Sequence, residues 1–140
     1  MSSTGFVLAI AEACEVAQVP YDDFILTIAA GSYPCLPGVD PGSSRQFDET
    51  DVLALYVYGR LLGFGALRAG EYACRVHSAL RSNACARSVS IALMPNGGKR
   101  VVVDHDQVSL PQAAPPEKIA FDLVAIRQFL KQPAEKRPKA

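Results

Sequence analysis

Four cysteines and two histidines are side chains of this sequence that could bind a zinc ion. Cys74 and His77 are three positions apart in one expected helix, and Cys85 and His105 follow them. Structural zinc sites use these residue types, but in closer, paired spacings such as Cys-x-x-Cys. Because no such spacing occurs here, we interpret the set as reduced, packed thiols and surface histidines, and we expect no metal and no cofactor.

The triplet Asp104-His105-Asp106 could orient an imidazole for general acid–base catalysis. The same triplet is also typical of a strand that runs out into solvent, and we favour that interpretation. The sequence has no glycine-rich phosphate loop and no nucleophile elbow, and Gly63-Phe64-Gly65 lacks both the further glycine and the preceding strand of such a loop. We therefore expect a protein that is not an enzyme.

Charge divides the chain into two electrically opposite halves. Residues 1–59 contain eight acids and one base, Arg45, for a net charge of minus seven; residues 60–140 contain thirteen bases and six acids, for plus seven. Such a division can steer self-association head to tail, or it can provide a basic surface for nucleic acid in the second half. Scattered, solvated charge is the remaining alternative.

Residues 14–24 have the spacing of a helix-turn-helix. A small residue, a turn residue and two apolar anchors would let two short helices pack at a steep angle, at Ala17, Gln18, Val19 and Phe24. Asp22 and Asp23, however, lie where a DNA-reading helix would begin, and carboxylates there repel the phosphate backbone. The pattern predicts the scaffold but not a DNA-reading surface.

The first half of the sequence is expected to be helical with one long loop. Apolar periodicity predicts helices over residues 7–16, 21–30, 48–62 and 67–81, with Gly31 ending the second and Asp48 capping the third. Residues 32–46 are rich in proline, glycine and serine, which predicts an exposed loop. Within it, Tyr33, Leu36 and Val39 could anchor a partner.

The second half is expected to contain a β-hairpin and a final helix. Residues 88–104 alternate around the turn signal of residues 95–98, residues 112–116 form a linker, and residues 133–140 form a disordered tail. A helix is predicted over residues 117–131, with an apolar stripe at Ile119, Leu123, Ile126 and Leu130. A lone hairpin is marginal and the stripe needs covering, which predicts a homodimer.

The predicted fold class is mainly α with a small β component. We expect a helical domain over residues 1–84, a hairpin and helix over residues 85–132 that serve dimerisation, and the tail. No apolar run approaches the roughly 20 residues that cross a bilayer, and no basic and apolar leader begins the chain. The sequence therefore predicts a cytoplasmic protein without a membrane partner.

The order of these elements over about residues 5–81 resembles the DNA-binding domain of MerR-type regulators, a winged helix-turn-helix. The matching positions are Ala17, Gln18, Val19, Gly31, Arg45, Phe47, Asp48 and the step Gly63-Phe64. Phage excisionases and small terminase subunits share this layout. The resemblance implies a transcriptional or phage-related regulator that binds double-stranded DNA as a dimer.

The resemblance also implies a set of DNA-contacting residues, which is reduced here. Where the family usually has an arginine followed by two aromatics, this sequence has Ile25, Leu26 and Thr27. The residues left for DNA contact are Tyr21, Thr27, Ser43, Ser44, Arg45, Arg60 and Arg68. Arg45 could instead pair locally with Asp48 or Glu49. The alternative function is a protein-interaction module, an antirepressor or adaptor, whose acidic N-terminal half binds a basic protein.

Overall fold

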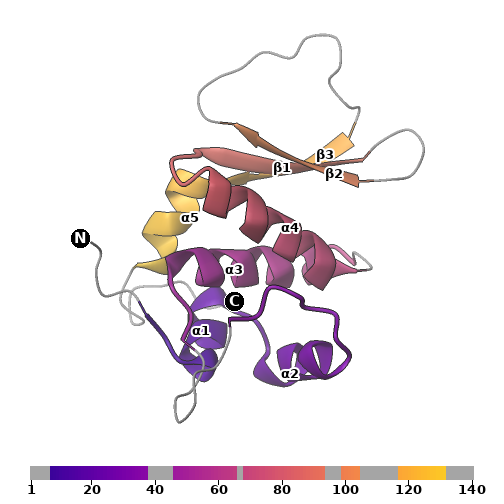
Figure 1. Cartoon of the computed structure of the whole chain (residues 1–140), viewed down its shortest axis with the longest axis vertical. Helices are drawn as coiled ribbons and strands as arrows, with labels where there is room; N and C mark the ends of the chain where they lie inside the picture. Colours follow the sequence, from indigo (N-terminus) through magenta and orange to yellow (C-terminus); the bar gives the residue numbers. More distant parts are fainter. Residues whose placement is uncertain (1–6, 38–45, 66–67, 94–98, 105–116, 132–140) are drawn as a thin grey trace.

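The computed structural model describes residues 7–37, 46–65, 68–93, 99–104 and 117–131. Within these ranges the chain forms five helices and three strands (Figure 1), in the order α1 (Ile10–Ala17), α2 (Tyr21–Ala29), α3 (Glu49–Gly63), α4 (Ala69–Ser82), β1 (Ser88–Leu93), β2 (Lys99–Asp104), β3 (Glu117–Asp122) and α5 (Leu123–Leu130). The fold is mainly α with a small β component, as the sequence predicts. In Figure 1 the pair α3 and α4 lies between the sheet and the short helices α1 and α2.

Helix α1 begins three residues later than its apolar periodicity predicts. Leu8 instead forms an antiparallel bridge with Phe47, in which each backbone N–H donates to the other residue's carbonyl at 2.9 and 2.8 Å. This pairing joins the start of the described chain to the segment before α3, and it removes Leu8 from the helix. Helix α2 follows a turn at Gln18 and ends before Gly31, whose φ of +74° supplies the predicted left-handed stop.

The N-terminus of α3 has the predicted aspartate cap. Asp48 accepts a hydrogen bond from the Asp51 backbone N–H, and the Asp51 carboxylate accepts one from the Asp48 N–H, each at 2.9 Å. Most of α3 is buried, including Val52, Leu55 and Leu61. The helix ends at Gly63, one residue after its predicted end, and α4 begins at Ala69.

The β-hairpin is confirmed with its predicted limits, but a third strand joins it. Strand β1 is central: it pairs antiparallel with β2 and with β3, so that Val89 lies opposite both Val103 and Phe121. The helix predicted over residues 117–131 is therefore wrong for its first six residues. Residues 117–122 pair along the free edge of β1, and α5 begins only after Asp122, whose side chain accepts from the Ala125 N–H.

The apolar stripe that motivated a dimer is covered within the chain. Leu123, Ile126 and Leu130 of α5 are buried in the same core as α3 and α4, and Ile119 is half-buried on β3. The stripe therefore does not require a second subunit. The homodimer itself stays a prediction.

Tyr33 belongs to the core rather than to a docking surface. Its ring packs edge-on against Phe24 and Tyr58, with ring centroids 4.9 and 5.6 Å away, and burial raises the pKa of its hydroxyl. Leu36 is half-buried against the same core, and Val39 lies outside the described residues. The prediction of an exposed partner anchor is wrong for Tyr33, because the segment after α2 folds back onto α3.

Candidate functional site

The exposed face of α2 is the first candidate site. Tyr21 and Leu26 are both exposed, Leu26 to 68% of its surface, which makes it the most exposed large apolar side chain of the described residues. Asp22 and Asp23 are exposed on the first turn of the same helix. Asp22 and Leu26 are one helical turn apart, so this face, which we call the α2 face, combines negative charge with apolar surface.

Thr27 uses its hydroxyl inside the protein. Its Oγ1 lies 2.5 Å from the Tyr58 hydroxyl and donates to the Asp23 carbonyl at 3.1 Å. Burial raises the pKa of Tyr58, although the Thr27 hydrogen bond opposes this. Of the two hydroxyl side chains of α2 proposed to contact DNA, only Tyr21 is therefore presented to solvent.

Arg60 and Arg68 of the predicted DNA-binding set have different neighbours. Arg60, with Tyr56 and Phe64, lines a groove of about 280 Å³ against β3 and α5, whereas Tyr58 of the same helix contacts α2. Arg60 thus projects from the opposite side of α3. Arg68 pairs with Glu71 at 2.7 Å. Ser43, Ser44 and Arg45 lie outside the described residues.

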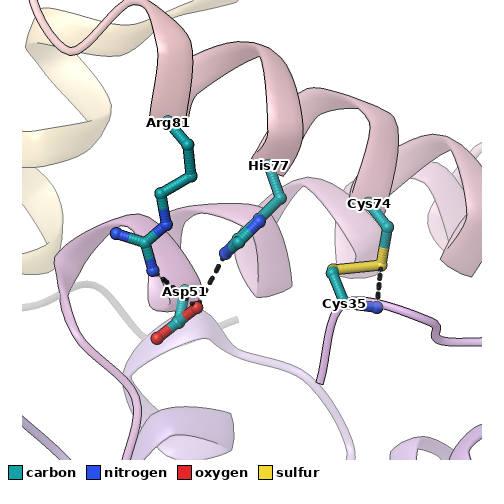
Figure 2. Close-up of a disulfide and its surroundings, with 5 residues drawn as sticks. All are labelled: Cys35, Asp51, Cys74, His77 and Arg81. Atoms are coloured by element: carbon teal, nitrogen blue, oxygen red, sulfur yellow. Dashed lines mark hydrogen bonds and ion pairs between the residues drawn. A yellow bond between two sulfur atoms is a disulfide. The ribbon is translucent and has the colours of Figure 1, made fainter. Parts of the chain in front are cut away.

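A cluster of charged side chains joins the first turn of α3 to α4, as Figure 2 shows. The buried Asp51 Oδ1 lies 2.7 Å from His77 Nε2 and 3.1 Å from Arg81 Nη2, and Arg81 Nη1 lies 3.0 Å from Asp48 Oδ2. The interpretation of His77 as a surface residue is wrong, since its side chain is only 14% exposed. Partial burial alone would raise the pKa of Asp48, but hydrogen bonds from Arg81 and the Asp51 N–H lower it below its usual value.

Sequence reasoning missed this cluster because its partners are distant in the chain. His77 and Arg81 are one turn apart on α4, so they share a face, but nothing local indicates that Asp51 meets them. Asp48 and Glu49, at the start of α3, have partners in other helices: Glu49 pairs with Lys131 at 3.1 Å, and Asp48 pairs with Arg81. Both carboxylate oxygens of Asp51 bind groups of this chain: Oδ2 accepts from the Asp48 N–H, and Oδ1 contacts His77 and Arg81. The cluster therefore links α3 to α4.

The cysteines depart from the prediction of reduced thiols. Cys35, in the segment after α2, and Cys74 of α4 form a disulfide across a separation of 39 residues (Figure 2). Cys14 is free and buried, as predicted, and burial raises the pKa of its thiol to about 11. Cys85 is free and exposed.

The disulfide also changes the metal-site candidates. Cys74 has no thiolate to offer a metal ion, and the part of the chain that the structure describes holds no group of three His, Cys, Asp or Glu residues arranged for one. Asp104 ends β2, whereas His105 and Asp106 lie outside the described residues.

Comparison with protein-family models and with curated proteins finds no match to this chain. Among the described helices, none has the length and apolar character needed to cross a membrane. The α2 face and its charges therefore carry the function proposed below.

Proposed function

We propose that this protein is a protein-interaction module whose α2 face binds a basic partner protein. One observation carries the proposal: residues 7–37 contain four acids, all exposed, and no lysine or arginine. The acids are Glu12, Glu15, Asp22 and Asp23. A surface of one sign attracts a partner of the opposite sign and repels one of the same sign.

Apolar contact would supply the rest of the binding energy. Leu26 is largely exposed in the free protein, and its complete burial against a partner is worth about 1.5–3 kcal/mol. Tyr21 is also exposed on α2 and adds an aromatic ring, a residue type that is enriched at protein interfaces. A partner segment with apolar side chains flanked by lysine or arginine fits this face.

A DNA-binding regulator is the second candidate. The arrangement of α1, the turn and α2, together with the Leu8–Phe47 bridge beside them, supports it, because this order matches the layout of a winged helix-turn-helix. The charge of α2 argues against DNA binding. Asp22 and Asp23 lie on its first turn, and their carboxylates would be repelled by the negatively charged phosphate backbone. The analogy of layout does not by itself assign a function.

One double variant separates the two candidates. Asp22→Asn with Asp23→Asn removes two charges from the α2 face and keeps similar side-chain volume. We measure the affinity of wild type and variant at low salt for two probes, a helical peptide of leucine and lysine and a random DNA duplex. The proposal expects the variant to bind the peptide about threefold to tenfold more weakly, with an effect that shrinks as salt screens the charges.

The opposite outcome would favour DNA. Unchanged peptide affinity, together with tighter duplex binding by the variant, would reject the interaction module and support the regulator. Glu71→Gln removes one carboxylate from α4 and serves as the charge control. Leu26→Ser tests the apolar contribution, with Val124→Ser on α5 as the matched exposed control.

A further inference from the structure

The Cys35–Cys74 disulfide lines a surface groove of about 460 Å³, with Glu71, Arg75 and Ser78 along one side. Figure 2 shows the bond at the edge of α4, where the segment after α2 crosses that helix. We propose that this groove is a thiol–disulfide exchange site for small acidic thiols of the glutathione class. Such a thiol would form a mixed disulfide with Cys35.

Burial selects which sulfur the incoming thiolate attacks. Cys74 is 8% exposed, whereas Cys35 is only half-buried, so an external nucleophile reaches Cys35 more readily. The Cys35 backbone N–H donates to Cys74 Sγ at 3.1 Å. That hydrogen bond stabilises negative charge on the Cys74 sulfur. Thiol–disulfide exchange is faster when the leaving group is a more stable thiolate, so Cys74 is the better leaving group.

The exchange balances without an oxidant. A thiolate of the small thiol attacks Cys35 Sγ, a new sulfur–sulfur bond forms, and the Cys35–Cys74 bond breaks with its electron pair passing to Cys74 Sγ. A second small thiol can then attack the sulfur of the bound one. This releases the symmetric disulfide of the small thiol, and the two cysteines take up protons as thiols.

The charges around the groove favour an acidic thiol. Arg75 is exposed on the rim, and its guanidinium lies over the Tyr72 ring at 5.0 Å, which limits its orientations. Glu71 is the acid of the groove, and Arg68 pairs with it at 2.7 Å. Two arginines against one glutamate leave a positive charge beside the disulfide, which attracts the carboxylates of a glutathione-type thiol.

Packing around the two cysteines makes the reaction reversible. Tyr33, two residues before Cys35, is buried against Phe24 and Tyr58, and it holds the segment when the bond is open. At Gly70 the backbone approaches so closely that a Cβ would lie 2.1 Å from the Ser32 carbonyl oxygen. These contacts keep Cys35 near α4 after reduction, so the Cys74 thiolate can displace a bound thiol and close the disulfide again.

The site of modification tests the proposal directly. The full chain carrying Cys85→Ser is incubated with millimolar reduced glutathione, free thiols are alkylated, and the peptides are mapped by mass spectrometry. We expect glutathione on Cys35 and the alkyl group on Cys74, whereas Cys14 stays unmodified until the protein is denatured. Glutathione on Cys74 in place of Cys35, or a disulfide that glutathione leaves intact, would overturn the proposal.

The charge of the thiol tests the groove. Arg75→Gln should slow exchange with glutathione about three- to tenfold and leave exchange with uncharged 2-mercaptoethanol unchanged. Arg87→Gln, the same loss of charge at an exposed position before β1, should slow neither thiol. Equal slowing of both thiols by Arg75→Gln, or no slowing of glutathione, would reject recognition of an acidic thiol.

Discussion

Replacement of Asp51 by alanine should destabilise this protein more than any exposed charge change. Asp51 is buried at the first turn of α3, accepts the Asp48 backbone N–H at 2.9 Å, and lies 2.7 Å from His77 and 3.1 Å from Arg81. Asp51→Ala removes all three contacts at once. It leaves His77, which is mostly buried, without a partner.

The size of this destabilisation depends on how exposed each partner of Asp51 is. A hydrogen bond to a charged group contributes about 1.5–3 kcal/mol, and we assign this to the contact with His77. The capping contact adds about 0.5–1 kcal/mol. Arg81 is 45% exposed and keeps its 3.0 Å pair with Asp48, so its loss is small. We expect Asp51→Ala to lower the free energy of unfolding by about 3 kcal/mol in total.

Urea unfolding of the full chain, with the disulfide intact, measures this change. The variant should unfold at a lower urea concentration with an unchanged dependence on denaturant, because the same surface becomes exposed. Glu71→Ala is the control: its exposed pair with Arg68 joins positions three apart at the N-terminus of α4, so its loss should change stability by less than about 0.5 kcal/mol. The double variant Asp51→Ala with His77→Ala should lose less than the sum of the two single changes, since each single change disrupts the same contact.

Equal destabilisation by Asp51→Ala and Glu71→Ala would refute the reasoning. Additive effects of Asp51→Ala and His77→Ala would also contradict it, because independent residues do not share an interaction energy.

Four further predictions follow from the same contacts and charges. Reduction of the Cys35–Cys74 disulfide, which closes a separation of 39 residues, should lower stability by up to about 4 kcal/mol, measured as urea unfolding with and without dithiothreitol; equal midpoints would contradict it. The lowered pKa of Asp48 stabilises the folded state above the ordinary value of 3.8, and this contribution is lost as pH falls through the lower folded pKa. Asp48→Asn should therefore destabilise the protein at neutral pH by an amount that disappears in acid, and a difference from wild type that is constant with pH would reject this. The remaining reason to expect a homodimer is the opposite charge of the two halves of the chain. Sedimentation at tens of micromolar should therefore show self-association that weakens as salt is added. A mass of one chain at low salt would exclude the homodimer. Deletion of residues 111–140 should unfold the chain rather than separate subunits, because it removes Leu123 and Leu130 from the core; a folded deletion variant by circular dichroism would contradict this.

Local chemistry determined most helices in advance. The Asp48 cap, the stop at Gly31 and the apolar periodicity of α2 and α4 depend on neighbours within a few residues, so they can be recognised in the sequence. The hairpin of β1 and β2 is equally local, because its strands are adjacent in the chain. The acidic first half is a property of composition, and it already identified the charges that carry the proposed function.

Contacts between distant residues required the tertiary structure. The spacing of the apolar side chains in residues 117–122 is compatible with a helix. These residues form a strand because they pair with the free edge of β1, which the sequence does not show. The partners of Asp51 and of Cys35 lie 26 and 39 positions away, at His77 and Cys74. Composition and spacing specify which side chains are present, but a salt bridge or disulfide forms only where the packing of α3, α4 and the segment after α2 brings the atoms within bonding distance.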